Sequence, residues 1–328
     1  MYQLVESTTR GRFFCHLSTS LEMTEKRLRE QALDDNVYYM YNTFMFKKVH
    51  SLVWSFDAEW APDPKAGRVL YKLPPDMSDV DVMGEMWQRG GATEENPTPF
   101  LKTVLCRVLS IAAVQRKVKN GETELSLLWL PRDVKDKEQS AEPEIIGRFL
   151  QAVGKNKPQL VGFNSQSADL KIFIQRAIVN GISAPGFCDR PDKPWEGEDY
   201  FARGSDFNID LMDIIGSWGK AALSLNEIAS LSGIPGKLET DGEQVPQMWL
   251  TGRWKEIIDY NCFDALTTYL VWLRTAHFGG FFTREQYEEE QELLRHSIFE
   301  WMETPELHFL EKYLEEWERL QAATGQIR

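Results

Sequence analysis

The chain has 328 residues, of which 42% are hydrophobic and 27% are charged. This composition suits a globular protein with a sizeable core and excludes a disordered or fibrous chain. The longest apolar run, Val108 to Val114, is interrupted by a serine and is much shorter than the roughly 20 residues of a membrane span. The first two dozen residues contain charges but no continuous apolar run. We therefore expect no secretory signal, no membrane contact and a cytoplasmic location.

The charge is unevenly distributed along the chain. There are 37 basic and 50 acidic residues, and the net charge of −13 argues against a surface built to bind phosphate backbones. Residues 281 to 328 hold twelve acidic and five basic side chains, so much of this charge lies in the last segment. The preceding residues therefore leave room for a local basic groove. The four scattered cysteines form no C-x-x-C pair, which indicates reduced thiols rather than disulfides or a zinc site.

The amino-terminal third combines one clear strand with two segments that are hard to interpret. Residues 1 to 47 show no hydrophobic period and form an extension of unknown role. Residues 51 to 57 are an apolar run that ends in a carboxylate, as expected of a buried core strand. Residues 61 to 100 contain many prolines, glycines and acids, so we expect a long insertion with little regular structure.

The central part of the chain predicts alternating strands and helices. Two β-rich runs, 103 to 118 and 122 to 130, flank Asn120-Gly121, which is a strong hairpin signal. A helix, a strand, a second helix and a further strand are expected in turn at 142–153, 159–163, 168–179 and 207–212. This order predicts an α/β fold with a mixed sheet and helices on both faces, because parallel strands need crossover connections.

The carboxy-terminal third is predicted to be helical. From Ser224 the helical pattern continues almost to residue 277, with a break at 233 to 242. We expect one core domain over 48 to 278. In the acidic segment 279 to 328, apolar residues from Leu310 to Leu320 recur at helical intervals. This pattern predicts a helical tail docked on the domain or on a protein partner.

Three polar patterns lie at places where strands and helices deliver functional residues. Asp57 and Glu59 point to one face of the first strand, although a polar strand end explains them equally well. Asp169 follows Asn164 at a strand-to-helix junction, where an acid also favours the helix dipole. Tyr260 and Asp264 share a helix face, and a solvated pair is the alternative explanation.

The order of these patterns resembles a known family. The three patterns in chain order are D-x-E, N-x-x-x-x-D and Y-x-x-x-D. They resemble the three motifs of the DEDD exonuclease superfamily, in the subclass with tyrosine in the third motif (DEDDy). Asp210-Leu211-Met212-Asp213 and Gly233 to Lys237 further resemble stand-alone predicted 3′–5′ exonucleases related to the proofreading domain of B-family DNA polymerases. The resemblance covers roughly residues 51 to 275, leaves out the extension and the tail, and implies a ribonuclease H-like fold.

The resemblance also implies a site and a reaction. The ligands of two divalent ions, Mg²⁺ or Mn²⁺, would be Asp57, Glu59, Asp169 and Asp264, and such hard oxygen ligands point away from zinc. Tyr260 would orient or help deprotonate the attacking water. Trp60, Asn164 and Lys237 are candidate substrate-binding residues, although a supporting role for Asn164 and a simple turn at Lys237 are alternatives.

The predicted function is a metal-dependent 3′–5′ exonuclease that releases nucleoside monophosphates from the 3′ ends of single-stranded DNA or RNA. DNA is favoured over RNA only through the polymerase resemblance. Two alternatives stay open at this stage. One is a catalytically silent nucleic-acid-binding or assembly protein that uses its acidic tail to bind a protein partner, and the other is a metal-dependent phosphatase.

Overall fold

The structure is a computed structural model. It describes residues 47 to 325 apart from 194–195, 203, 217–222 and 239–241, so the predicted extension lies outside the described residues except for Lys47. The chain divides into two units, residues 1 to 47 and residues 48 to 328, and all helices and strands described below belong to the second.

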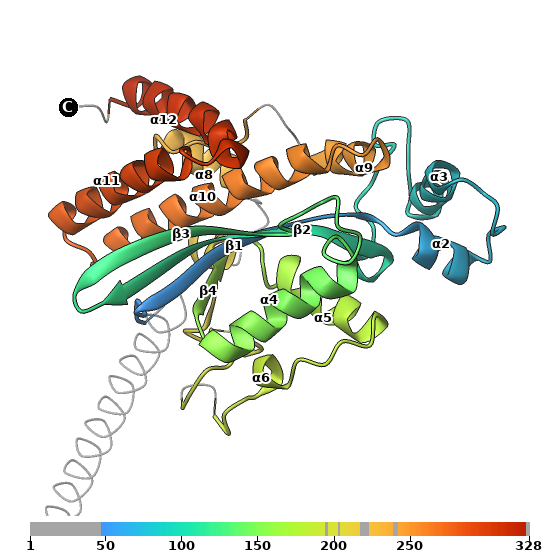
Figure 1. Cartoon of the computed structure of the whole chain (residues 1–328), viewed down its shortest axis with the longest axis horizontal. Helices are drawn as coiled ribbons and strands as arrows, with labels where there is room; N and C mark the ends of the chain where they lie inside the picture. Colours follow the sequence, from blue (N-terminus) through green and yellow to red (C-terminus); the bar gives the residue numbers. More distant parts are fainter. Residues whose placement is uncertain (1–46, 194–195, 203, 217–222, 239–241, 326–328) are drawn as a thin grey trace, which may run out of the picture. The chain divides into compact units, whose positions relative to one another are not determined.

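A five-stranded mixed sheet forms the centre of the fold (Figure 1). Its order is β3-β2-β1-β4-β5, in which β1 pairs antiparallel with β2 and parallel with β4. The strands are β1 Leu52–Pro62, β2 Cys106–Lys119, β3 Glu122–Leu130, β4 Gln159–Gly162 and β5 Asn208–Asp210. The hairpin prediction is confirmed, since Asn120 and Gly121 both have the positive φ that this tight turn requires. The remaining predicted strands are also present, although β5 is shorter than expected.

Strand β1 is longer than predicted, and this changes where its carboxylates lie. Asp57 and Glu59 were expected at the end of the strand, but the strand continues through both of them to Pro62. The register with β2 shifts between Glu59 and Trp60, where Leu109 is left unpaired. Such a bulge bends the ladder locally and re-aims side chains, which is common next to functional sites.

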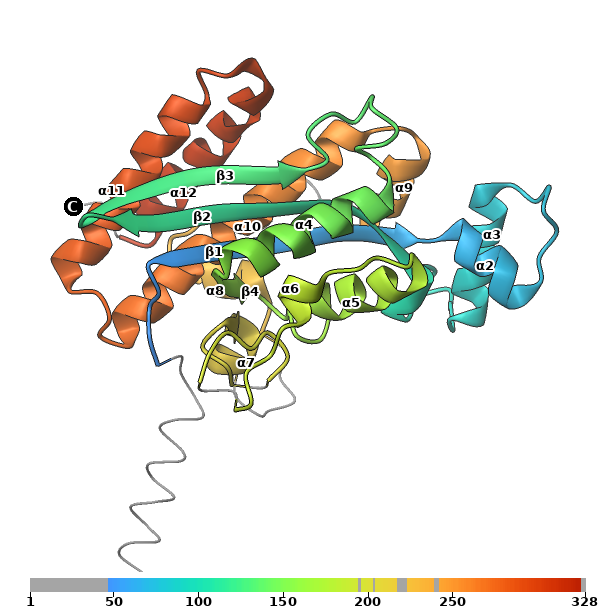
Figure 2. The same cartoon turned by 60° about the horizontal axis from the view of Figure 1, so that its bottom comes forward.

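Three helices cover one face of the sheet: α4 Glu142–Asn156, α5 Asp169–Val179 and α6 Pro185–Cys188 (Figure 2). Trp54, Phe56 and Ala58 of β1 point to this face and pack against apolar side chains of α4 and α5. The 25-residue helix α10, Trp254–Phe278, lies on the other face against β1 and β2. Alternate residues of β1 therefore enter two different cores, as strand geometry requires.

Two shorter helices, α8 Leu225–Leu231 and α9 Val245–Leu250, contact α10. Helix α7 Leu211–Gly216 directly follows β5, and a 3₁₀ turn, η2 Gly242–Gln244, precedes α9. Gly236 lies in the loop after α8, where an added Cβ would come within 2.2 Å of the Asn226 Oδ1 atom. Only glycine allows this loop to pass so close to α8, and Thr267 of α10 holds it from the other side by donating to the Pro235 carbonyl at 2.8 Å.

The expectation that residues 61 to 100 lack regular structure is wrong. Helices α2 Pro64–Tyr71 and α3 Asp79–Arg89 form there, and they project beyond the end of β1 in both views (Figure 1 and Figure 2). Pro64 occupies the first helical position, where its missing N–H costs no hydrogen bond, and Asp63 and Ser78 cap the two helices. We call residues 63 to 101 the arm. A 3₁₀ turn, η1 Thr103–Leu105, connects it to β2.

The predicted helical tail is present and docks on its own domain. It comprises α11 Arg284–Trp301, the 3₁₀ turn η3 Pro305–Leu310 and α12 Glu311–Ala323. Tyr313 and Trp317 of α12 are fully buried, and the Tyr313 ring stacks on Phe263 of α10. Glu290 of α11 accepts hydrogen bonds from Arg116 of β2 and from the Tyr269 hydroxyl of α10, which ties the tail to the sheet.

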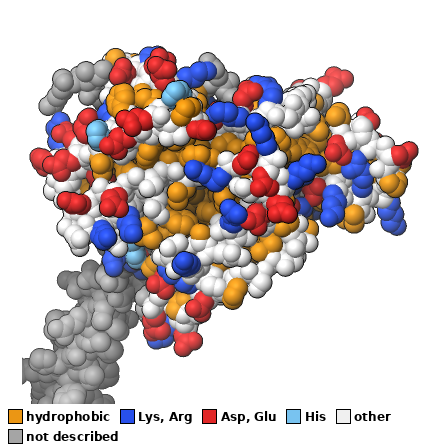
Figure 3. All heavy atoms as spheres, in the orientation of Figure 1, with side chains coloured by type: hydrophobic (Ala, Val, Ile, Leu, Met, Phe, Trp, Pro, Cys, Tyr) orange, Lys and Arg blue, Asp and Glu red, His pale blue; other side chains and the backbone are white. Residues whose placement is uncertain are grey.

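The fold is therefore the α/β class predicted, with a mixed sheet between helical layers and a helical tail. This is the ribonuclease H-like arrangement that the resemblance implies. Across the described part of the chain, none of the helices combines the length and apolar character needed to cross a membrane. Basic and acidic side chains are interspersed on the face seen in Figure 3, so the negative net charge does not remove local positive groups.

Candidate active site

The first pair of carboxylates lies on the α10-facing side of β1. Glu59 is buried at 8% exposure and Asp57 is partly buried. The alternation of the strand places both on this face, because the alternating residues Phe56 and Ala58 enter the opposite core. Asp57 and Glu59 pair in register with Ala112 and Ser110 of β2, near the middle of the sheet. The pairing with β2 at these two residues, and with β4 just before them at Val53 to Ser55, therefore fixes their positions.

Helix α10 brings a third carboxylate to the same place. One ligand oxygen from each of Asp57, Glu59 and Asp264 lies within 4.8 Å of the others. Tyr260 is one helical turn before Asp264, and its hydroxyl shares a hydrogen bond with the Asp264 carboxylate. The spacing seen in the sequence thus places both side chains on the helix face that covers β1.

Asn261 connects the helix directly to the first strand. Its Nδ2 donates to Asp57 Oδ2 at 2.7 Å, and its Oδ1 accepts from the Ser110 hydroxyl at 2.9 Å. The side chain is fully buried. A buried amide with both ends bonded sets the distance between α10 and β1 and restricts the rotation of the Asp57 carboxylate.

The fourth carboxylate, Asp169, opens α5 at the edge of the same group. It is 3% exposed, and backbone hydrogen bonds from Ala58 of β1 and from its own residue reach its side chain. Its negative charge acts on Asp57 more strongly than those of the other two carboxylates, which places it beside the cluster. The structure thus brings Asp57, Glu59 and Asp264 into one group, with Asp169 next to it.

The loop before Asp169 is held by a residue outside the predicted set. Asp210 at the end of β5 accepts hydrogen bonds from the backbone N–H groups of Asn164 and Gln166, at 2.8 and 2.9 Å. Asn164 adopts a left-handed backbone with φ of 62°, and its carbonyl accepts from the N–H of Ala168 at 3.0 Å. Asn164 therefore shapes the turn that delivers Asp169, which agrees with the supporting role rather than with substrate binding.

The carboxyl groups disfavour one another's negative charge. Burial raises the pKa of Asp57 well above its usual range, and the charges of the other three carboxylates raise it further. Burial also raises the pKa of Asp169, to about 7. Burial, followed by the charge of Asp264, raises the pKa of Tyr260. Gathering buried carboxylates that repel one another is energetically unfavourable, and such a cluster is typical of a site that binds cations.

The donor set tests which cation would fit. It consists of carboxylate oxygens alone, delivered by β1, α5 and α10, with three of them close enough to share one ion. Hard oxygen donors suit Mg²⁺ or Mn²⁺, whereas zinc prefers nitrogen and sulfur. A divalent ion with oxygen ligands therefore fits the residues present.

The other two candidate substrate residues lie apart from the carboxylates. Trp60 follows Glu59 but packs toward the α4 and α5 core, and one side of it lines a pocket with the arm. Lys237 is exposed in the loop after α8, where its backbone N–H donates to Asn226 Oδ1 at 2.8 Å. Contact of Trp60 and Lys237 with a bound strand stays a prediction.

Sequence reasoning missed Asn261 and gave Asp210 too small a role. Asn261 stands three residues before Asp264, a spacing that puts both on one helix face, and this was the available signal. Asp210 lies inside the strand predicted at 207–212 and ends the observed β5, but only the strand order shows that it lies beside the loop of Asn164.

Comparison with known proteins places the chain in a family. A search of curated proteins found no match. Residues 98–317 match the model of a family described as predicted 3′–5′ exonucleases related to the exonuclease domain of PolB. The match begins after Asp57 and Glu59 and continues through α11 into α12, so the expectation that the resemblance leaves out the tail is wrong. Because the match covers more than half of the sequence, the chain belongs to this family of predicted 3′–5′ exonucleases.

Proposed function

We propose that the protein is a metal-dependent 3′–5′ exonuclease of the tyrosine (DEDDy) subclass that acts on single-stranded 3′ ends. Family membership supports nuclease activity on nucleic acid at a coarse level. The observation that carries the finer proposal is the convergence of Asp57, Glu59 and Asp264 oxygens within 4.8 Å, with Tyr260 one helical turn from Asp264. Two motifs separated by about two hundred residues in the sequence thus form one site.

Four carboxylates would hold the ions. Asp57, Glu59 and Asp264 would share one, and Asp169 with Asp57 would complete the place for a second. The chemistry that two divalent ions supply in such a site is activation of the attacking water and stabilisation of the leaving oxygen. The contribution of the chain is to hold these oxygens on rigid elements, so that little rearrangement is needed when substrate binds.

Tyr260 would position the attacking water. Its side chain is 6% exposed and packs against Ala61 and Leu109, so the ring has little freedom. Its hydroxyl lies beside Asp264, on the side of the carboxylates. A fixed hydroxyl there can hydrogen-bond to a water and orient it toward phosphorus, which is worth a substantial part of the rate.

The domain limits, the compartment and the choice of strand stay predictions. We assign catalysis to residues 48 to 278 and treat the arm and the tail as additions to that domain. DNA is favoured over RNA through the relation to PolB, and release of nucleoside monophosphates is the expected reaction. A cytoplasmic location is still expected, and so is a protein partner for the acidic tail.

The test is a time course on a 5′-labelled single-stranded DNA oligonucleotide and its RNA counterpart, with Mg²⁺, Mn²⁺ or chelator at matched salt. We expect a metal-dependent ladder that shortens from the 3′ end, and its loss in Asp57→Asn and Asp264→Asn. Asp259→Asn is the matched control, because Asp259 lies on the same helix but pairs with Lys255. Full activity in both site variants would refute the assignment, and binding without hydrolysis would favour the silent binding protein.

A further inference from the structure

We propose that the arm forms a stacking subsite for an unpaired nucleobase of the substrate strand, next to the active site. The inference rests on the proposed function and adds to it a specificity element. Trp87 and Asn96 of this subsite lie before the segment that matches the family model, so family membership does not assign it.

The arm is a compact structure with its own small core. Val82 and Met86 of α3 pack with Leu105, and further apolar side chains of the arm cover them. Helix α2 approaches α3 closely, since a Cβ on Gly67 would come within 2.6 Å of the Met86 sulfur. Side chains on the arm are therefore held in defined positions, as a binding surface requires.

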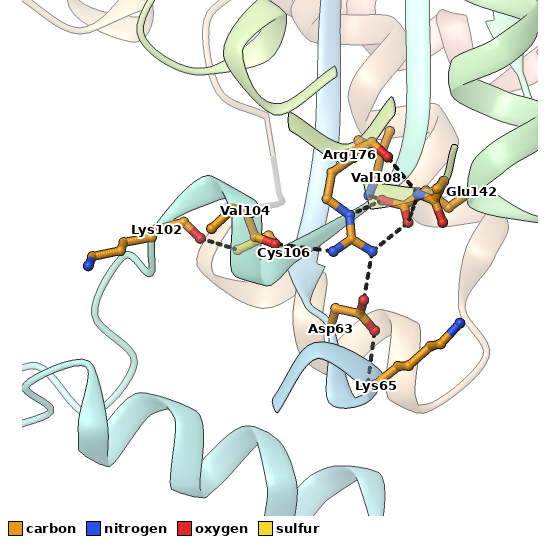
Figure 4. Close-up of polar contacts among 9 residues, drawn as sticks. Asp63, Lys65, Lys102, Val104, Cys106, Val108, Glu142 and Arg176 are labelled. Carbon is orange, nitrogen blue, oxygen red and sulfur yellow. Dashed lines mark hydrogen bonds and ion pairs between the residues drawn. The ribbon is translucent and has the colours of Figure 1, made fainter. Parts of the chain in front are cut away.

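A buried ionic network fixes the base of the arm to the domain (Figure 4). The Arg176 Nη2 atom of α5 donates to Asp63 Oδ2 and to Glu142 Oε2, both at 2.6 Å. Asp63 also caps α2 by accepting from the N–H of Lys65 at 3.0 Å. All three charged groups of the network are buried, so the arm leaves β1 in a set direction.

A pocket lies between the arm and the end of β1. Trp87 and Phe100 contribute aromatic surface from the arm, Trp60 does so from β1, and Asn96 and Thr98 contribute polar groups. The Phe100 side chain is 91% exposed, which is unusual for an aromatic residue without a bound partner. Gly242, from the turn before α9, also lines the pocket.

This pocket borders the candidate active site through Gly242. Trp60 directly follows Glu59 in β1. A Cβ built on Gly242 would lie 3.8 Å from the Tyr260 hydroxyl, so the pocket wall borders the residue assigned to the attacking water. A strand whose phosphate reaches the carboxylates would therefore have a neighbouring nucleotide at the pocket.

The chemistry of the lining selects a base rather than a phosphate. None of the described residues that line the pocket is charged, whereas a phosphate site would need lysine or arginine. Aromatic faces stack on bases of any sequence, and amide and hydroxyl groups can bond to base edges. Because a paired base would first have to lose its pairing and stacking, at a cost in free energy, the subsite favours a single-stranded or frayed end.

The test measures equilibrium binding of a fluorescein-labelled oligothymidylate, without divalent metal, to the full chain and to Phe100→Ala. We expect about tenfold weaker binding by the variant. The matched control is Phe278→Ala, since Phe278 is similarly exposed but lies at the far end of α10 from Tyr260. Trp87→Ala is a second variant. A set of oligothymidylates, each with one abasic residue at a different position near the 3′ end, shows which base of the strand occupies the pocket.

The outcomes separate the subsite from the proposed activity. An abasic residue at one position that weakens binding by the full chain, but not by Phe100→Ala, supports the subsite. Equal binding of the oligothymidylate by Phe100→Ala and by the full chain overturns the subsite. So does a Phe100→Ala variant whose binding is weaker than that of the full chain by the same factor on every abasic strand. Base-dependent binding without hydrolysis would refute the proposed exonuclease activity and still support the subsite. Hydrolysis without base-dependent binding would support the exonuclease activity and refute the subsite.

Discussion

Asn261 offers a direct test of whether helix α10 sets the position of Asp57, the first carboxylate of the candidate site. In Asn261→Ala, Asp57 loses the donor at 2.7 Å and the Ser110 hydroxyl loses its acceptor at 2.9 Å. A hydrogen bond to a charged group contributes about 1.5–3 kcal/mol and a neutral one about 1 kcal/mol. We therefore expect the free energy of unfolding to fall by about 3 kcal/mol, measured by urea denaturation in the presence of chelator.

The catalytic effect should appear in the metal dependence. A side chain that orients a ligand carboxylate typically changes metal affinity or activity by about 10–100-fold when it is removed. The half-saturating Mg²⁺ or Mn²⁺ concentration for exonuclease activity should therefore rise by at least about tenfold in Asn261→Ala.

Ser110→Ala is the matched control. It removes the second partner of Asn261 and leaves the bond to Asp57 in place. We expect it to lower the free energy of unfolding by about 1 kcal/mol and to leave the half-saturating metal concentration unchanged. If Asn261→Ala is destabilised but keeps the metal dependence of the wild type, Asn261 has only a structural role and the reasoning is wrong.

Three further predictions concern the support of the site. Glu290→Gln leaves the buried Arg116 without its carboxylate, so urea denaturation should show a loss of about 3–5 kcal/mol, whereas Glu288→Gln, in an exposed pair with Arg284, should change little. Gly236→Ala should lower the free energy of unfolding by about 1–3 kcal/mol, and Asn226→Gly in the same chain should restore part of it, because the added Cβ would meet Asn226 Oδ1. Trp317→Ala should cost about 3–5 kcal/mol without changing the kcat of the folded protein, and a lowered kcat would show that the tail acts on the site.

Local chemistry made much of the fold predictable. Asn120-Gly121 predicts the hairpin because both residues tolerate the left-handed backbone that its turn needs, and both adopt it. The helical spacing from Ile145 to Val153 predicts α4 because each of those apolar residues faces the core. In both cases the decisive information lies within a few neighbouring residues.

The arm shows where such reasoning fails. Its prolines and glycines were interpreted as breakers, but Pro64 starts α2, and Gly67 lets α2 approach α3. Whether a proline breaks or begins a helix depends on the residue that caps it. Here that residue is Asp63, whose other contact is Arg176 in α5. A contact across more than a hundred residues cannot be inferred from local spacing.

The candidate site divides in the same way. Its carboxylates could be chosen from the sequence because the order of the three motifs resembles the DEDD family, whereas the spacing within each motif left an ordinary structural explanation open. Asn261 and Asp210 could not be assigned their partners, because their hydrogen bonds join segments far apart in the sequence. The residues expected to bind metal thus follow from the resemblance of the motifs, and the residues that hold them in place can be assigned only from the fold.

Helix α5 links the two parts of the proposed substrate site. It begins at Asp169, beside the carboxylate cluster, and two turns later it carries Arg176, which holds the base of the arm. Seven residues of helix span about 10 Å and do not bend appreciably. Movement of the arm relative to the carboxylates would therefore have to break the buried contacts of Arg176 or shift α5 itself. A base stacked on the arm and a phosphate at the carboxylates would be held at a fixed separation, which favours in-line attack at one linkage along the strand.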